Sequence, residues 1–276
     1  MNVNNQRPCR RCFSHMTIRT ASQTSLKAGA AVWRNGVCDL LMIAAAFMLY
    51  NVVRTGSANQ QIAATYNAVD LVKLERTLGI AQENSSQGLI LWSSELITLF
   101  NTIYTYGHFW LIGTAAIWLF IRHRETFTLF RNAIFISGAI ALVCYNLFPL
   151  APPRLLPGEF GAVDTLRLYS SVNYENSGWA VNEYAAIPSL HVAWNLLISL
   201  AIASVVENRL VRVWAFCMPL VMTITVVLTG NHWILDAVAG YAVGAIGLGI
   251  AVLCRRSGWR VRQFLIPEPS QPTVSA

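Results

Sequence analysis

Six long apolar runs constrain this chain more than any other feature of its sequence. They cover residues 36–53, 105–121, 132–150, 188–206, 213–229 and 233–253. Each run is close to the roughly 20 residues that a helix needs to cross a bilayer. Only 12% of the 276 residues are charged, whereas soluble domains usually have about 25%. The runs therefore predict an all-α fold, a polytopic membrane helical bundle with about six transmembrane spans.

Two segments between the first and second runs are expected to form an outer amphipathic or re-entrant part. In residues 59–80, apolar side chains recur three or four residues apart among charged ones, at Ile62, Tyr66, Val69 and Val72. This spacing predicts an amphipathic helix that lies in the membrane interface. Residues 88–104 are apolar but include a glutamate and an asparagine. They are compatible with either a re-entrant segment or a partial span.

The positions of the basic residues predict the orientation of the spans. If the N-terminus lies inside and six spans alternate, only five of the 20 Lys and Arg residues lie outside: Arg54, Lys73, Arg76, Arg154 and Arg167. Cytoplasmic flanks of membrane helices are enriched in these residues, so both termini are expected in the cytoplasm. A seventh span at 88–104 would move basic clusters to the wrong side. The net charge of +7 is thus a topology signal, and we expect no nucleic-acid partner.

The same pattern predicts the domain organisation. Residues 1–35 read as a disordered basic cytoplasmic tail, residues 36–253 as the membrane-embedded domain, and residues 254–276 as a second cytoplasmic tail. A CxxC pair, Cys9 and Cys12, stands in the N-terminal tail. A structural zinc site needs four ligands and usually a second such pair, which the sequence does not contain. We therefore expect no metal and no cofactor.

Three ionisable residues stand inside or at the ends of apolar runs: His191, His232 and Asp236. Ionisable groups in membrane helices are costly, which makes them functional candidates. In the predicted topology all three converge on the outer face of the plasma membrane. The polar loop 151–187 lies on the same side, and a loop of this length is more often functional than idle.

The spacing of these residues indicates acid–base and nucleophilic chemistry. His232 and Asp236 are four residues apart, so they share one helix face. The carboxylate can accept the Nδ1 proton, which leaves Nε2 as a nucleophile. His191 follows Pro188 and Ser189 at a helix start, where free N–H groups bind anions. Ser189 is thus a candidate phosphate-binding residue and His191 a general acid. Each feature alone also fits a cap or a structural pair, whereas the combination on one face indicates catalysis.

The segments Pro188-Ser189-Leu190-His191 and His232-Trp233-Ile234-Leu235-Asp236 resemble the second and third signature motifs of the type-2 phosphatidic acid phosphatase superfamily. Further features resemble its branch that contains inositol-phosphorylceramide synthase: Leu74-Glu75-Arg76, Asn101-x-x-Tyr104-x-x-x-His108-Phe109 and Pro149-Leu150-Ala151-Pro152-Pro153-Arg154. The resemblance covers roughly residues 36–253. It implies that the third-motif histidine attacks phosphorus, its aspartate orients it, and the second-motif histidine protonates the leaving group.

The sequence departs from the superfamily pattern at two cationic positions. The first motif usually has a lysine upstream of an Arg-Pro pair, but here Arg154 follows Pro153. The arginine expected six residues before the third-motif histidine is Val226. Arg154, with Arg167 from the same loop, is therefore expected to bind phosphate through its planar fork of donors. These departures favour the synthase-like branch over a simple phosphatase.

Tyr104 and His108 open the second span on the outer side. They are candidate substrate-binding residues that line the pocket, although packing between helices is an alternative. Asn195 lies four residues after His191 on the same helix face and has the same two interpretations.

The sequence therefore predicts a membrane lipid phosphatase or phosphotransferase that acts through a phosphohistidine-type intermediate, most like an inositolphosphotransferase. Its substrate would be a membrane phospholipid or a polyprenyl phosphate, and its acceptor either water or a polyol or lipid hydroxyl. A small non-enzymatic transporter or scaffold is the alternative. Transporter sites usually lie near the bilayer midplane, whereas these ionisable residues gather at one face. The sequence does not indicate the oligomeric state.

Overall fold

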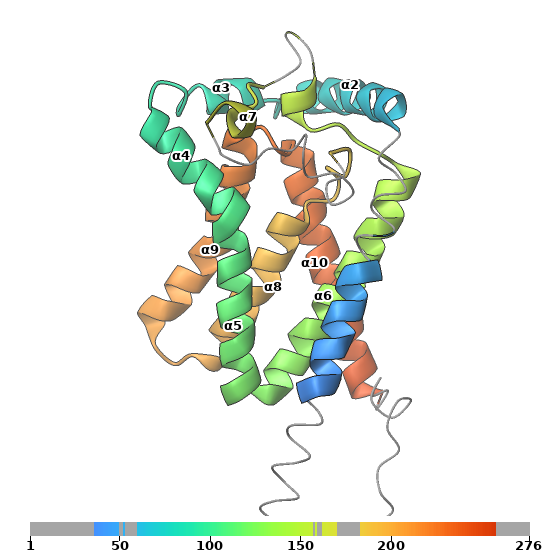
Figure 1. Ribbon diagram of the computed structural model, residues 1–276, viewed down its shortest axis with the longest axis vertical. Coiled ribbons are helices and arrows are strands. Elements are labelled where there is room, and N and C mark those ends of the chain that lie inside the picture. Colours follow the sequence, from blue (N-terminus) through green and yellow to red (C-terminus); the bar gives the residue numbers. More distant parts are fainter. Residues whose placement is uncertain are drawn as a thin grey trace, which may run out of the picture. The chain divides into compact units, whose positions relative to one another are not determined.

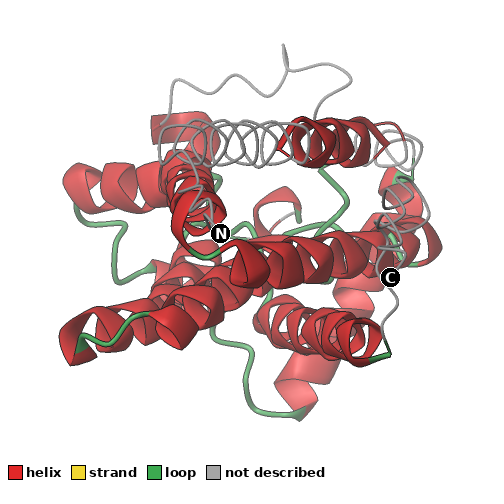
Figure 2. Cartoon of the chain, turned by 90° about the horizontal axis from the view of Figure 1, so that it is seen from below, coloured by secondary structure: helices red, strands yellow, loops and turns green. Residues whose placement is uncertain are grey.

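The computed structural model describes residues 36–49, 52, 60–156, 158, 162–169 and 183–257. These residues form helices joined by loops and turns, and none belongs to a β-strand (Figure 2). The predicted all-α fold is confirmed. The predicted tail 1–35, its CxxC pair and most of the predicted C-terminal tail lie outside the described residues.

The chain divides into two compact units, Met1–Leu49 and Tyr50–Ala276. The described part of the first unit is one apolar helix, Gly36–Leu49, which coincides with most of the first predicted span. Every candidate site residue belongs to the second unit.

Three short or amphipathic helices, α2 (Gln61–Thr77), α3 (Glu83–Gln87) and α7 (Thr165–Tyr169), lie across one end of the second unit's long helices (Figure 1). The amphipathic helix predicted at 59–80 is thus present as α2. Its buried stripe consists of Ala64, Ala68, Leu71, Val72 and Glu75, whereas the side chains of Ile62 and Tyr66 are exposed. Small alanines allow close packing, and the Ala64 carbonyl accepts the amide of Ala151 at 3.1 Å.

The remaining helices form the bundle: α4 (Ser94–Thr102), η1 (Ile103–Gly107), α5 (His108–Arg122), α6 (Arg124–Leu147), α8 (Leu190–Val205), α9 (Arg209–Leu228) and α10 (Ile234–Arg256). A short 3₁₀ turn, η2 (Pro153–Leu155), follows α6. Helix α8 packs against α5, α6, α9 and α10, and α10 also packs against α6. The helix that begins at the predicted Pro-Ser-x-His motif is therefore the centre of the bundle.

Among the described residues, α6, α9 and α10 are long and apolar enough to cross a membrane, and α8 is a shorter apolar helix. The helix boundaries differ from the predicted runs, most clearly at both ends of α6 and at the start of the second predicted span. Helix α6 begins at Arg124 and not at residue 132, because the polar turn Arg124–Arg131 continues the helix while its phenylalanines are buried. It ends at Leu147, because Leu150 is already extended and bridges to Ala185.

Most of the segment 88–104 belongs to the same continuous helix as the second predicted span. Helix α4, capped by the Ser93 hydroxyl, which accepts the amide of Leu96, continues through η1 directly into α5. The η1 segment is π-helical, and single π-helical turns inside α-helices often occur at functional sites. Residues 94–104 thus continue into the helix of the second predicted span and change the helical phase just before His108.

A row of glycines brings α10 close to its neighbours. A Cβ atom at Gly240 would collide with the carbonyl oxygen of Ser189. At Gly244 it would lie 3.2 Å from the Ala193 oxygen, and at Gly247 it would lie 2.8 Å from the Ala133 oxygen. Small residues permit such backbone contacts between membrane helices. Gly240 therefore determines how closely the start of α8 approaches the first turns of α10.

Candidate active site

A tight turn between α9 and α10 presents His232. Gly230 has a φ of +69°, a conformation that L side chains rarely adopt. The amides of Asn231 and His232 both donate to the Val226 carbonyl, at 3.0 and 3.1 Å. A Cβ atom at Gly230 would also crowd Ala162 at 3.1 Å. Gly230, Asn231 and His232, the three residues between the last two apolar runs, thus form a hydrogen-bonded turn that fixes the backbone of His232.

The Nδ1 atom of His232 faces two oxygen acceptors. It lies 2.9 Å from the carbonyl oxygen of Ala186 and 3.3 Å from Oδ2 of Asp236. A backbone carbonyl can only accept a hydrogen bond, so Nδ1 carries the proton in the neutral imidazole. Nε2 is then the ring atom with a free lone pair. The sequence predicted Asp236 as the Nδ1 partner; the structure adds a shorter bond to a carbonyl that sequence reasoning did not identify.

Asp236 is fully buried, and its carboxylate contacts two groups. Its Oδ2 accepts the Trp233 amide at 2.9 Å and contacts the His232 ring. Its Oδ1 has no hydrogen-bond partner among the described residues. The aspartate therefore closes the first turn of α10 while it contacts the imidazole.

His191 is the second residue of α8 and is surrounded by aromatic rings. The Tyr104 ring is stacked on it with a centroid separation of 4.4 Å, and the His108 ring lies 4.6 Å away. The His232 ring is 5.8 Å away at an angle of 59°. The second span thus packs two of its predicted site residues directly against the first histidine, and the two histidines of the predicted pair are close neighbours.

His108 is held by the helix that it faces. Its Nδ1 lies 2.7 Å from Nδ2 of Asn195, and the same amide nitrogen donates to the His191 carbonyl at 2.8 Å. An amide nitrogen only donates, so His108 Nδ1 is an acceptor and its proton lies on Nε2. Asn195 therefore connects His108 to the turn that carries His191.

Ser189 is buried at the N-cap of α8. Its amide donates to the Asp236 carbonyl at 3.0 Å, which couples the starts of α8 and α10. Its hydroxyl has no hydrogen-bond partner among the described residues. Before Ser189, the Pro188 carbonyl accepts the Tyr145 hydroxyl at 2.8 Å. The predicted phosphate-binding serine is thus placed beside the His232–Asp236 pair.

Arg154 reaches the His232 turn from the loop after α6. Its amide donates to the Gly230 carbonyl, and its Nε donates to Oδ1 of Asn231, both at 3.0 Å. Its Nη1 lies 3.3 Å from Asp164 and 3.4 Å from Glu183. The Arg154 side chain is only 6% exposed. The guanidinium therefore lies next to the turn that carries His232, between two carboxylates.

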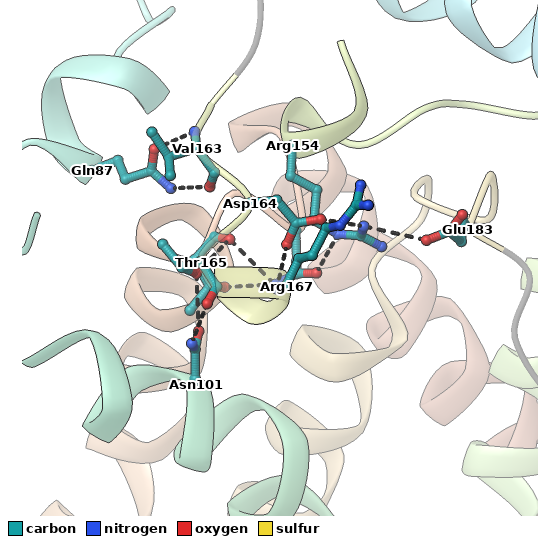
Figure 3. Close-up of polar contacts among 10 residues, drawn as sticks. Gln87, Asn101, Arg154, Val163, Asp164, Thr165, Arg167 and Glu183 are labelled. Atoms are coloured by element: carbon teal, nitrogen blue, oxygen red, sulfur yellow. Dashed lines mark hydrogen bonds and ion pairs between the residues drawn. The ribbon is translucent and has the colours of Figure 1, made fainter. Parts of the chain in front are cut away.

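Arg167 lies on α7, at the edge of the same region (Figure 3). Its amide donates to Oδ1 of Asp164 at 3.0 Å, and its side chain is exposed. The carboxylate of Asp164 thus contacts both Arg154 and the backbone of Arg167. The two arginines predicted to bind phosphate are brought to one side of the His232 turn.

Two side-chain amides fix the segment that carries Asp164 (Figure 3). Gln87 of α3 donates to the Val163 carbonyl at 2.9 Å and accepts its amide at 2.7 Å. Asn101 of α4 donates to the Thr165 carbonyl and accepts the Thr165 hydroxyl, at 2.8 and 2.9 Å. Each pair is reciprocal, so the residues on both sides of Asp164 are each fixed by two hydrogen bonds.

Val226 shows why no cation stands at the position where the superfamily pattern has an arginine. Its side chain is fully buried in an apolar cluster with Val192, Met222 and Ala237. An arginine there would place an unpaired charge in the core.

Sequence reasoning missed several groups of the site. Glu75 was singled out only as part of a motif. No role was predicted for Glu83 or Gln87, which bond to the site from other segments, or for Asn231, which bonds to Arg154. Tyr184, near Arg154, has a pKa above its ordinary value because of burial and the neighbouring Glu183 carboxylate. No local periodicity marks these residues, because their partners are distant in the sequence.

A family model described as the PAP2 superfamily matches residues 69–250, which include all eight predicted site residues. A search of curated proteins gave no match. Among solved structures, the crystal structure of Aquifex aeolicus LpxE is similar, with a TM-score of 0.44 and 18% identity. That similarity covers 58% of this chain and 85% of the other.

Proposed function

Because the chain belongs to the PAP2 superfamily, a group of membrane phosphoric-ester enzymes, we propose that it releases or transfers the phosphate of a membrane lipid through a phosphohistidine intermediate on His232. The observation that carries this proposal is the bonding of Nδ1 to the Ala186 carbonyl and Asp236. This bonding leaves Nε2 unprotonated, and the His232 ring lies 5.8 Å from the His191 ring. A nucleophile and a separate acid require such an arrangement.

The reaction would have two steps. In the first, Nε2 of His232 attacks phosphorus, the bond from phosphorus to the ester oxygen breaks, and His191 gives its proton to the leaving alkoxide. In the second, neutral His191 takes a proton from water or a hydroxyl, whose oxygen attacks phosphorus and releases His232. Asp236 stabilises the positive charge that develops on the imidazole. A general acid of this kind contributes about 10² to 10⁴ in rate.

The remaining predicted residues would bind the phosphate and shape the site. Arg154, fixed by Asn231 beside the His232 turn, would offer its guanidinium to the phosphoryl oxygens, with Arg167 at the entrance. Ser189 would add a hydroxyl donor at the start of α8. Tyr104 would hold the His191 ring in place by stacking, and His108 by the contact of its tilted ring.

Transfer to a hydroxyl acceptor is favoured by the groups around Arg154. Asp164 and Glu183 are carboxylates within 3.4 Å of its guanidinium, and carboxylates accept hydrogen bonds from polyol hydroxyls. Val226 also replaces a cation that the superfamily pattern uses for phosphate. We propose a phosphotransferase most like the inositolphosphotransferase branch, with a phospholipid or polyprenyl phosphate as donor and a polyol or lipid hydroxyl as acceptor.

An assay with defined donors tests this function. Purified protein in mixed micelles would receive phosphate-labelled phosphatidic acid, phosphatidylinositol or polyprenyl phosphate, with and without inositol and a lipid alcohol. We expect the donor to be consumed. Without an acceptor, the label should appear in the hydrolysis product, which is inorganic phosphate for the monoester donors and inositol phosphate for phosphatidylinositol. When a hydroxyl acceptor is added, the label should move to an ester of that acceptor, and label that always ends in the hydrolysis product would refute transfer. Wild-type protein that consumes no donor faster than the His232→Ala variant would refute the function.

The site is proposed to face the outside of the plasma membrane, with both termini in the cytoplasm. In a background whose native cysteines are replaced by serine, Leu168→Cys on α7 should react with an impermeant maleimide in intact cells. Ser257→Cys, after α10, should react only after permeabilisation. Both positions are exposed, so access to the reagent depends on sidedness. The reverse labelling pattern would place the site in the cytoplasm.

A further inference from the structure

The first turn of α10, directly after His232, is bonded to three carboxyl groups. The first amides of a helix have no acceptor within the helix. Here the Trp233 amide donates to Asp236 at 2.9 Å, the Ile234 amide to Oε1 of Glu83 at 3.0 Å, and the Leu235 amide to Oε1 of Glu75 at 2.8 Å. Three consecutive amides thus have a carboxyl oxygen each, and two of these come from outside the helix.

Glu75 and Glu83 belong to the outer helices α2 and α3, which lie across the end of the bundle (Figure 1). Their residues are 0% and 4% exposed. Buried glutamates are rare unless their charge is compensated. The two bonds connect the outer layer to the helix that carries His232 and Asp236, over sequence separations of 160 and 151 residues.

The two glutamates are also close to each other. Oε2 of Glu75 is buried and has no donor partner among the described residues, and the side chain of Glu83 is within its hydrogen-bonding reach. The pKa of Glu75 is raised to about 8, mainly by burial and also by the negative charges of Glu83 and Asp236, while the Leu235 amide opposes the shift. A proton on Glu75 satisfies the orphaned oxygen by donation to Glu83. The pair then holds one negative charge at the positive end of α10.

We propose that Glu75 and Glu83 are positioning residues of the reaction, a carboxyl pair with one shared proton that fixes the first turn of α10 and thereby the direction of the His232 imidazole. This inference rests on the proposed function, because it takes His232 as the reacting group. Neither glutamate touches the substrate; each acts through the backbone of Ile234 or Leu235.

The shared proton makes this support dependent on pH. Glu75 is neutral below about pH 8 and charged above it. The titratable groups that face it are Glu83 of α3 and Asp236 of α10. Tyr184, which packs against the same apolar cluster as α2, has a raised pKa and stays neutral in this range. Above pH 8 three carboxylates repel one another at one helix end, so the turn loosens and kcat falls.

The test compares Glu75→Gln, Glu75→Ala and Glu83→Ala in the full-length protein, with phosphatidic acid in mixed micelles as the probe. A glutamine cannot ionise, but its oxygen still accepts the Leu235 amide and its NH₂ still donates to Glu83. We expect Glu75→Gln to keep kcat within about threefold at pH 7 and to lose the alkaline fall near pH 8. Both alanine variants should lose about 10- to 100-fold in kcat, with KM nearly unchanged, since small misplacements of a reacting group have effects of this size. Glu95→Gln, an exposed carboxylate at the start of α4, is the matched control and should resemble wild type.

A second measurement does not depend on turnover. Carbethoxylation of His232 by diethyl pyrocarbonate, quantified by peptide mass spectrometry relative to His123, reports access to the imidazole. The relative rate should rise above pH 8 in wild type, stay flat in Glu75→Gln, and be several-fold higher at pH 7 in Glu75→Ala. An unchanged alkaline rise in Glu75→Gln, or wild-type reactivity in Glu75→Ala, would overturn the inference. If wild type consumes no phosphatidic acid, carbethoxylation alone decides the positioning role, and the absence of turnover counts only against the proposed function.

Discussion

His232→Ala is expected to abolish turnover and to prevent labelling of the protein by phosphate-labelled lipid. The substitution removes Nε2 of His232, the proposed nucleophile, so the loss should exceed about 10³-fold. Rapid quenching of wild type in alkaline detergent should trap a label that is stable to base and labile to acid, as expected of a phosphoramidate. His123→Ala, which removes a histidine at the junction of α5 and α6, should retain both turnover and labelling.

The Asp236→Asn substitution should reduce turnover less than His232→Ala does. The Ala186 carbonyl, at 2.9 Å from Nδ1, keeps the tautomer when the carboxylate is lost. Supporting groups of this type contribute about 10² to 10⁴ in rate, and we expect the lower end of this range.

Substantial turnover by His232→Ala, or labelling of that variant at another histidine, would show that the nucleophile is assigned incorrectly.

His191→Ala should show a loss that depends on the leaving group. If His191 protonates the departing alkoxide, the variant should lose about 10² to 10⁴ in kcat on alkyl phosphate lipids. The nitrophenolate group of nitrophenyl phosphate leaves without protonation. The loss of kcat on this substrate should therefore be at most about tenfold. The ratio of the two deficits is the measured quantity, because any general damage to the site affects both substrates.

Tyr104→Phe is the matched control for the His191 experiment. It keeps the ring that is stacked on His191 at 4.4 Å and removes only the hydroxyl, so the ratio between the two substrates should remain that of wild type. Equal deficits of His191→Ala on both substrates would contradict the acid role and leave His191 as a structural neighbour of His232.

The close approach of α8 and α10 explains why the two motifs meet. Their sequences show only that each histidine begins an apolar run. Gly240 removes the side chain that would collide with the Ser189 carbonyl, and the Ser189 amide bonds to the Asp236 carbonyl. These contacts place the two imidazole rings 5.8 Å apart. The sequence suggested that the histidines share a membrane face; their separation depends on backbone packing between helices.

The second span shows where local patterns fail. The apolar run 105–121 was identified, but the helix begins at Ser94 and contains the π-helical turn Ile103–Gly107. Hydropathy does not register this turn, because it changes the phase of the helix and not its polarity. The turn immediately precedes His108, and both Tyr104 and His108 contact His191. Whether these residues line the site or pack elsewhere was therefore open from the sequence.

The sequence by itself determined the helical membrane fold, the approximate positions of the spans, and the pairing of His232 with Asp236. These properties depend on hydropathy and on the 3.6-residue period, which act over one or a few helical turns. The tertiary structure alone decided that Ala186 is the nearest acceptor for His232, that Asn195 holds His108, and that Glu75 and Glu83 cap α10. These partners lie from 46 to 160 residues apart in the sequence. Which distant groups meet depends on how helices pack, and packing follows from the contacts of all residues together and not from any local pattern.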